Sequence, residues 1–323
     1  MQAIVYTHYG SPGVLQLTEV EKPVPKDSEV LVKVQAASVN AYDWHFVTGS
    51  PFLVRISGSG LRRPKNQRLG VDVAGRVEAV GSNVTQFHVG DEVFGRGTGA
   101  FAEYACARED RMALKPANVS FEAAAAVPIA ALTALGALRD SGHLQSGQRV
   151  LIQGASGGVG TFAVQLAKLF GADVTAVCST RHIDLARSIG ADHIIDYTRE
   201  DVTKSGQQYD LILGVNGYHS IFAYRRALRP TGIYVMVGAA NARILRAFLQ
   251  MLLLGPMMSR TGKRKMVLHS ANPTRKDLEF VKELLEKGKV VPVIDRTYPL
   301  RETAEAFRYL EEGHPGGKIV ITV

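Results

Sequence analysis

The sequence has few cysteines, a single tryptophan and no apolar run long enough to cross a bilayer. Cys106 and Cys178 are too few for a disulfide framework or a four-cysteine metal site, so a reducing compartment is expected. The most apolar run, 244–258, is interrupted by Arg246 and a Gly-Pro pair, whereas a membrane helix needs about 18 to 20 apolar residues. The N-terminus lacks the charged start and apolar stretch of a signal peptide. These absences predict a soluble, cytoplasmic protein.

The overall composition limits the possible partners. Charged residues make up 21% of the 323 residues and apolar residues 46%, so extended disorder is excluded. Lys and Arg (38) outnumber Asp and Glu (30), and the net charge of +8 is compatible with nucleic acid, an anionic membrane or a polyanionic ligand. The sequence argues against nucleic-acid binding, because aromatic residues are only 7% and no RNA-binding module is recognisable.

The sequence pattern changes twice along the chain. Residues 1–120 consist of short runs rich in β-branched residues, separated by Gly, Pro and Asn, which predicts a β-rich unit. Ser120 is expected to cap an alanine-rich helical stretch, 121–138. From Arg149, apolar strand runs alternate with amphipathic helices, which is typical of a parallel, doubly wound α/β sheet. The length suits two domains.

A glycine-rich turn separates the first strand of the alternating region from its helix. It reads Gln153-Gly154-Ala155-Ser156-Gly157-Gly158-Val159-Gly160. Glycines let the backbone turn tightly and approach a pyrophosphate, which then lies at the helix N-terminus. With alternating elements on both sides, we expect Ser156, Gly157, Gly158 and Val159 to bind a dinucleotide. The alternative is a tight turn without a ligand.

The end of the second strand distinguishes NAD from NADP. An NAD site places a carboxylate there to bind the ribose 2′-hydroxyl. Here the chain reads Cys178-Ser179-Thr180-Arg181, in which two hydroxyls and a guanidinium suit a 2′-phosphate. We therefore predict NADPH as the cofactor, contacted by Ser179, Thr180 and Arg181. The alternative is a helix cap at Thr180 followed by a solvated arginine.

Three motifs are specific in combination. They are ASGGVGTFAVQLAK at 155–168, GADHIIDY at 190–197 and the terminal GGKIVITV. Together they resemble the zinc-free quinone oxidoreductases and alkenal or enone reductases of the medium-chain dehydrogenase/reductase superfamily, over essentially the whole chain. The resemblance implies a GroES-like, β-rich catalytic domain made of residues 1–125 and 266–323. It also implies an inserted Rossmann domain at 126–265, and a homodimer.

The same resemblance implies the reaction. We expect hydride transfer from NADPH to a quinone, or to the C=C bond of an α,β-unsaturated carbonyl. An NADPH-dependent enoyl-thioester reductase is the alternative among enzymes. A non-catalytic NADPH- or RNA-binding protein is the alternative outside enzymes.

The zinc ligands of the superfamily can be compared position by position. Asn40 stands where zinc alcohol dehydrogenases have a cysteine, and 70–72 reads Gly-Val-Asp where they have Gly-His-Glu. Residues 121–140 contain neither Cys nor His, and the four cysteines of the structural zinc lobe are missing. Because zinc needs about four N, S or O ligands, we expect no metal. Alcohol oxidation would then lack its Lewis acid.

The stretch SVNAYDWH, residues 38–45, is the expected edge of the active site. Family members have Asn-Pro-x-Asp-Trp-Lys here, so Asn40 and Asp43 match. We expect Asn40 to donate to the substrate oxygen or orient a carboxamide, and Asp43 to order the loop rather than transfer protons. Tyr42 either protonates the product or only packs. His45 replaces a lysine near the cofactor, which puts a constant positive charge there in doubt.

Seven further positions are expected at the cofactor through the resemblance. Thr133 is expected beside the nicotinamide and Tyr197 near the adenosine phosphate. Asn216 and the pair Val237-Gly238 follow parallel strands, at the edge where such sheets bind ligands. The remaining two are Gly317 and Lys318, for which a turn and a solvated lysine are the alternative.

Residues 241–265 join an apolar stretch to the basic sequence RTGKRK. In the family this region tends to line the substrate pocket or a subunit contact, which we expect here. Contact with a membrane surface is the alternative, because apolar residues next to lysines and arginines suit an anionic interface.

Overall fold

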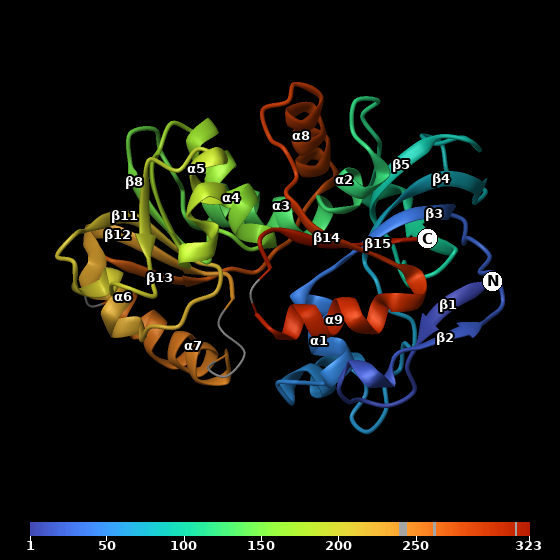
Figure 1. Cartoon of the computed structure of the whole chain (residues 1–323), viewed down its shortest axis with the longest axis horizontal. Coiled ribbons are helices and arrows are strands. Elements are labelled where there is room, and N and C mark those ends of the chain that lie inside the picture. Colours follow the sequence, from blue (N-terminus) through green and yellow to red (C-terminus); the bar gives the residue numbers. More distant parts are fainter. Residues whose placement is uncertain (239–243, 261–262, 314) are drawn as a thin grey trace. The chain divides into compact units, whose positions relative to one another are not determined.

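The computed structural model describes residues 1–238, 244–260, 263–313 and 315–323 (Figure 1). The chain forms two compact units: a terminal unit, Met1–Ala130 with Thr274–Val323, and an inserted unit, Ala131–Pro273. Both ends of the chain therefore build one unit, as expected. The predicted boundaries, after residues 125 and 265, precede the observed ones, which lie after Ala130 and Pro273. The second predicted boundary would cut strand β13 (Lys265–Leu268).

The inserted unit contains a six-stranded parallel sheet, which confirms the predicted doubly wound fold. Its strands are β8 (Arg149–Gln153), β9 (Asp173–Cys178), β10 (His193–Asp196), β11 (Tyr209–Gly214), β12 (Leu228–Met236) and β13. Their spatial order is β10-β9-β8-β11-β12-β13. The order reverses between β8 and β11, and ligands bind such sheets beyond the carboxyl ends of the strands at this switch point.

Helices cover both faces of this sheet. α4 (Gly158–Leu169) and α5 (Ile183–Ser188) lie on one side, with α6 (Ile221–Ala227) and α7 (Ile244–Arg260) on the other (Figure 1). Strand β8 is a continuous apolar run because it is covered on both faces, and Val150, Leu151 and Ile152 are fully buried. The core therefore holds the end of β8 in place, directly before the glycine turn.

The terminal unit is β-rich, as predicted. Its main sheet consists of β3 (Glu29–Val39), β4 (Asp72–Val80), β5 (Glu92–Arg96), β6 (Tyr104–Arg108), β7 (Met112–Leu114), β14 (Ile294–Pro299) and β15 (Lys318–Thr322), and β1 (Gln2–Val5) pairs with β2 (Gln16–Glu19). Its helices are α1 (Ala41–Thr48), α2 (Phe121–Ala125), α8 (Arg275–Glu286) and α9 (Thr303–Glu311). The terminal strand β15 pairs antiparallel with β3, with Ile319 opposite Val39. This register brings the last residues of the chain next to the 38–45 stretch.

Two local predictions are adjusted by the structure. Ser120 caps a helix as expected, its hydroxyl accepting from Ala123 N at 3.2 Å. The helix is not continuous, however: α2 ends at Ala125 and α3 (Pro128–Gly136) begins at a proline, because the residue before a proline is biased away from helix. The 38–45 stretch is not a loop: Ser38 and Val39 end β3, Asn40 caps the next helix, and α1 begins at Ala41.

Helix α7 runs through the Gly255-Pro256 pair, which the sequence pattern suggested as a break. Ser259 Oγ donates to the Gly255 carbonyl at 2.8 Å, which gives this carbonyl a side-chain partner within the helix. Within the residues described above, no helix combines the length and apolar character required to cross a membrane.

Candidate active site

The glycine turn after β8 depends on two of its glycines for its shape. Gly154 has φ of +80°, a left-handed conformation that favours glycine. A Cβ on Gly160 would lie 2.0 Å from the Gly154 carbonyl oxygen, so the first turn of α4 has no room for a side chain there. A Cβ on Gly157 would have its nearest neighbour, the same oxygen, at 3.7 Å. The turn is therefore tight inside and open at Gly157.

This turn presents backbone donors to its open side. Gly157 caps α4 without a side chain, and the first intrahelical bond runs from Thr161 N to Gly157 O at 2.9 Å. The N–H groups of Gly158, Val159 and Gly160 therefore have no intrahelical acceptor. Such donors, together with the helix dipole, bind phosphates. The turn fits a dinucleotide pyrophosphate, and Ser156 lies half-buried within it.

The Ser179-Thr180-Arg181 segment follows directly on β9. Ser179 is buried, while Thr180 and Arg181 are exposed. No ion pair with Arg181 exists among the residues whose structure is described, so its guanidinium is available to an anion. The segment thus offers a cation at the strand end where a ribose would lie.

Asp196, at the end of β10, is an acid beside this segment that the sequence pattern does not reveal. It is 7% exposed and accepts from the Thr180 hydroxyl, from Thr198 N at 2.9 Å and from Thr198 Oγ1 at 2.7 Å. These hydrogen bonds, the one from Thr180 foremost, lower the pKa of Asp196. Because the Thr180 hydroxyl already donates a hydrogen bond to Asp196, Ser179 and Arg181 are the donors left for a phosphate.

The other cofactor positions of the inserted unit lie at or near the same sheet edge. Asn216 is exposed just after β11, and its N donates to Gln153 O at 3.3 Å, beside the glycine turn. The N atoms of Val237 and Gly238 donate to Gly214 O at 2.9 and 3.1 Å. The structure therefore brings these residues to the carboxyl edge of β8, β11 and β12.

Tyr197 and Thr133 are the last two predicted cofactor positions of the inserted unit. Tyr197 is 40% exposed directly after β10, and its ring centroid lies 5.9 Å from that of Tyr218. Thr133 is half-buried in α3. Their contact with a cofactor remains a prediction.

In the terminal unit, a buried polar network joins β3, β4 and β15. Lys318 Nζ donates to Asn40 Oδ1 at 2.5 Å and lies 3.5 Å from Asp72 Oδ2. The same carboxylate oxygen accepts from Asn40 Nδ2 at 3.0 Å and from Ser38 Oγ at 2.7 Å. The second oxygen of Asp72 accepts from Ile129 N at 2.9 Å. Burial lowers the pKa of Lys318, against the opposing charge of Asp72.

This network changes the expected roles of two residues. The Asn40 amide group donates to Asp72 and to Ser38 O at 3.2 Å, so within this unit its donors are already used. Lys318 is 3% exposed and is not a solvated lysine. Its partner Gly317 has φ of +137°, and a Cβ there would lie 2.5 Å from Val293 O. Within this unit, Asn40 and Lys318 are therefore hydrogen-bonded to each other.

Asp43, at the start of α1, binds backbone groups. Its carboxylate accepts from Asn40 N at 3.0 Å and from Gly70 N at 3.3 Å. Burial, reinforced by the charge of Asp72, raises the pKa of Asp43 to about 7. The group therefore titrates near neutrality.

Tyr42 and Arg96 are the polar groups at this edge whose donors are not used internally. Tyr42 is 50% exposed, and its ring packs 4.5 Å from that of Phe46. Burial of its inner part raises the pKa of Tyr42, and the Arg96 guanidinium opposes this shift. Arg96 ends β5 opposite Asp72, and its Nε is buried without a hydrogen-bond partner. Among the described residues no carboxylate forms an ion pair with it.

Arg96 was not found from the sequence, because an arginine after a strand reads as an ordinary surface charge. The Gly70-Val71-Asp72 turn was the one signal for Asp72, through its position in the zinc comparison. Its role as the centre of a buried network depends on the register of β3, β4 and β15, which the sequence does not show.

His45 does not supply a constant positive charge. Its Nδ1 lies 2.6 Å from Ser50 O, and because a carbonyl only accepts, Nδ1 carries the proton. Burial lowers the pKa of His45. The imidazole is thus neutral at neutral pH, and its expected contact with the cofactor remains a prediction.

Throughout residues 1–238, 244–260, 263–313 and 315–323, no three His, Cys, Asp or Glu side chains gather as metal ligands would. The residues at the positions compared with zinc ligands do not suit the ion either. Asn40 and Asp72 are bound to the Lys318 ammonium, and Val71 offers no ligand atom.

Comparisons with known proteins agree with the two-unit fold. The model of the alcohol dehydrogenase GroES-like domain matches residues 26–117, and that of the zinc-binding dehydrogenases matches 189–321. The chain is 34% identical to the chloroplast envelope quinone oxidoreductase homolog of Arabidopsis thaliana, over 99% of this chain and 98% of that protein. It is 33% identical to the chloroplastic NADPH-dependent alkenal/one oxidoreductase of the same plant, over 99% and 79%. The solved quinone oxidoreductase from Coxiella burnetii has a TM-score of 0.86 and 31% identity, covering 100% and 99%.

A GroES-like unit built from both chain ends, with an inserted Rossmann sheet and its glycine turn, defines a two-domain dehydrogenase or reductase. This class contains several families. The chain belongs to the quinone oxidoreductase and enone reductase branch of the medium-chain dehydrogenase/reductase superfamily, a family of oxidoreductases. The resemblance drawn from the sequence motifs is thereby confirmed.

Proposed function

We propose that the protein transfers hydride from NADPH to a quinone, or to the C=C bond of an α,β-unsaturated carbonyl, and does so without zinc. The observation that carries the proposal is the open glycine turn at the start of α4, followed one strand later by the free Arg181 guanidinium. The names of the two plant relatives, a quinone oxidoreductase homolog and an NADPH-dependent alkenal/one oxidoreductase, support the same reaction.

The inserted unit holds the cofactor in this proposal. The N–H groups of Gly158, Val159 and Gly160 bind the pyrophosphate, and Arg181 with Ser179 binds the 2′-phosphate. When bound, the nicotinamide supplies a hydride to the electron-poor carbon of the acceptor. Asn216, Val237 and Gly238 line the same sheet edge and position the cofactor.

The terminal unit supplies the groups that stabilise the negative charge of the reduced acceptor and donate a proton to it. Hydride addition leaves an enolate or hydroquinone oxyanion, which needs stabilisation and one proton. We assign the stabilisation to Arg96, whose guanidinium has no ion pair within the described part of the chain, and the proton to the exposed Tyr42 hydroxyl or to solvent. Asn40, Asp43 and Lys318 then position α1 rather than touch the acceptor.

The remaining features of the protein follow the family resemblance. We propose that it needs no zinc, because Lys318 is the cation bound to Asn40 and Asp72. A homodimer and a cytoplasmic location complete the proposal. Both are inferred from the resemblance and the sequence composition rather than from contacts.

The reaction is tested by measuring NADPH oxidation with 1,2-naphthoquinone, an alkenal and a crotonyl thioester in parallel, with and without a chelator. We expect turnover with the quinone or the alkenal, unchanged by the chelator. Fastest turnover with the thioester would instead identify an enoyl-thioester reductase. NADPH binding without turnover of any acceptor would indicate a non-catalytic nucleotide-binding protein.

A further inference from the structure

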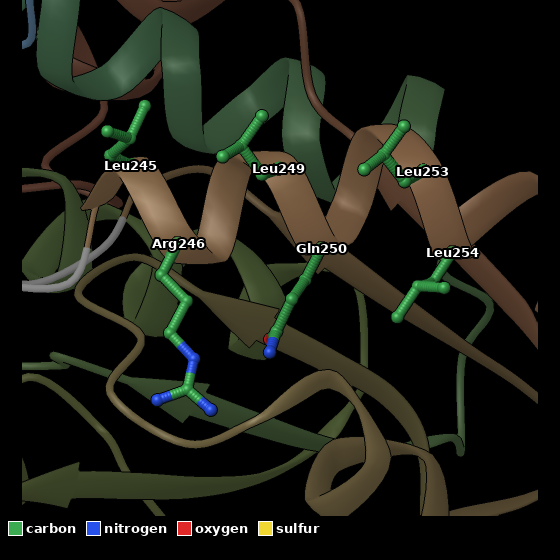
Figure 2. A pocket seen from close by; sticks show the side chains of 6 residues that line it. All are labelled: Leu245, Arg246, Leu249, Gln250, Leu253 and Leu254. Carbon is green, nitrogen blue, oxygen red and sulfur yellow. The ribbon is translucent and has the colours of Figure 1, made fainter.

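Helix α7 carries a row of exposed apolar side chains. Leu245, Leu249, Leu252, Leu253 and Met257 are exposed by 49, 43, 56, 69 and 55% of their area. Figure 2 shows Leu245, Leu249 and Leu253 projecting from one side of the helix, while Arg246 and Gln250 project from another. These residues, with Leu254, line a shallow groove along α7. We call the five exposed side chains the α7 stripe.

The opposite side of α7 fixes the helix to the inserted unit. Met251 and Met258 are 5 and 4% exposed and belong to the core of this unit, with Ala247 packed against it. Met266 N, in β13, donates to Ser259 Oγ at 3.0 Å. The helix is therefore held in place by its inner face. Leu249 and Leu253 of the α7 stripe do not belong to this core.

The charged residues of the segment that contains the stripe are all basic. No Asp or Glu occurs between residues 244 and 268, whereas Arg246, Lys263 and Lys265 are exposed. Arg264 is anchored, its Nε donating to Leu228 O at 3.0 Å and Arg229 O at 3.1 Å. An exposed apolar stripe with only basic neighbours is typical of helices that lie in a membrane interface and are attracted by anionic lipids.

A second copy of the chain fits this surface less well. In a two-fold symmetric contact each patch faces its own copy. Two patches of the same positive sign, each with Arg246, Lys263 and Lys265, would then face each other, with no acid between residues 244 and 268 to offset them. We propose that the α7 stripe, with Lys263 and Lys265, binds the surface of an anionic lipid bilayer, with α7 lying in the plane of the interface. This inference does not depend on the proposed reaction.

The test is cosedimentation of the full-length protein with phosphatidylcholine vesicles, with or without phosphatidylglycerol. We expect the protein to bind the anionic vesicles and binding to weaken as salt is raised. Leu249→Ser with Leu253→Ser removes apolar area, and Lys263→Gln with Lys265→Gln removes charge. Each pair should weaken binding about tenfold or more. Val24→Ser, which changes an 84% exposed apolar residue of the terminal unit, is the matched control and should bind normally.

Three outcomes would overturn the inference. One is the absence of binding to either vesicle type. In the second, the wild type does not bind vesicles, and light scattering gives the Leu249→Ser, Leu253→Ser variant half the molar mass of the wild type. This result would identify the stripe as a contact between copies of the chain. The third is a fall in kcat/KM for a water-soluble quinone without any vesicle binding, which would place the stripe in the acceptor pocket. Circular dichroism and the melting temperature show whether each variant is folded.

Discussion

Lys318 is the least expected residue of the terminal unit, because a lysine with 3% exposure is costly unless it is paired. Its partners are Asn40 and Asp72, and both are satisfied by further internal hydrogen bonds. The same three residues would otherwise be candidates for metal binding or catalysis. Their mutual contacts make them a structural network that holds the start of α1, and leave the chemistry to the exposed groups beside it.

Arg181 decides the choice between NADPH and NADH if the cofactor proposal is right. Arg181→Ala should raise the KM for NADPH about tenfold or more, because a charge-assisted contact to the 2′-phosphate is lost. The KM for NADH should change little. Arg187→Ala, an exposed arginine on α5 paired with Asp184, is the matched control and should leave both values unchanged. Equal effects of Arg181→Ala on the two cofactors would contradict the phosphate contact.

Tyr42 and Arg96 should act on turnover rather than on cofactor binding. We expect Tyr42→Phe and Arg96→Gln each to lower kcat on the order of 10- to 100-fold, since a proton donor or an oxyanion partner is lost. The KM for NADPH should be unchanged. Arg108→Gln, an exposed arginine paired with Asp110, is the control. If kcat stays at the wild-type value in both variants, these side chains do not take part in the reaction.

Asp43 should make stability depend on pH. Its pKa of about 7 lies above that of an unfolded aspartate, so between about pH 4 and 7 the folded state binds a proton that the unfolded state does not. This group therefore lowers the free energy of unfolding as the pH rises through that window, by up to about 1.4 kcal/mol per pH unit.

This slope can be measured by urea unfolding at pH 5 and pH 7.5. Asp43→Asn should show a smaller loss of stability over this interval than the wild type. Asp184→Asn, at a carboxylate 98% exposed, should behave like the wild type. Identical pH dependence of the wild type and Asp43→Asn would show that Asp43 is ionised throughout.

The glycine turn and α4 form one element, and substitutions at two of its glycines should differ in their effect on stability. Gly160→Ala places a methyl group 2.0 Å from Gly154 O, so it should destabilise the protein by about 1 to 3 kcal/mol and weaken NADPH binding. Gly157→Ala meets nothing closer than 3.7 Å, so only the poorer capping by alanine should lower the stability, by less than about 1 kcal/mol. Because Gly157 faces the proposed pyrophosphate, this second variant should still weaken NADPH binding, measured by fluorescence titration.

If Gly157→Ala lost as much stability as Gly160→Ala, a side chain would have no room at Gly157 either. Unchanged NADPH affinity in both variants would mean that the cofactor does not approach this turn.

Secondary structure followed from the sequence wherever the pattern was local. The strands β8 and β9, the helix α4 and the capping serine at 120 are all set by neighbouring residues. The helix α1 was not predicted, because its start is held by the Asp43 carboxylate, which accepts from Asn40 N and from the distant Gly70 N. A short polar stretch with this pattern reads as a turn until its partners are known.

The parts of the site that depend on local sequence were also predictable. The glycine turn and the strand ends of the inserted unit depend on local sequence and on the alternation of elements, and both are visible in the chain. In the network, Lys318 is 278 positions from Asn40 and 246 positions from Asp72 along the chain, and the pairing of β3 with β15 and β4 brings the three residues together. Arg96 and Asp196 were missed for the same reason.

For the molecule as a whole, the nested arrangement explains why both chain ends are needed. β15, at the C-terminus, completes the sheet of the terminal unit and supplies Lys318. The net charge of +8 is then partly accounted for by Arg181 and Arg96, which face anionic ligands in the proposed reaction, and by the basic residues after α7. A general affinity for nucleic acid is not needed to explain it.

The proposed reaction is tested most directly by identifying its product. The enzyme would be incubated with NADPH deuterated at either face of the nicotinamide C4, together with 1,2-naphthoquinone or an alkenal, and the product analysed by NMR. We expect the hydroquinone, or a saturated aldehyde with one deuterium at the β-carbon from one of the two labelled cofactors. An allylic alcohol with deuterium on the former carbonyl carbon, or no product from either acceptor, would contradict the proposed function.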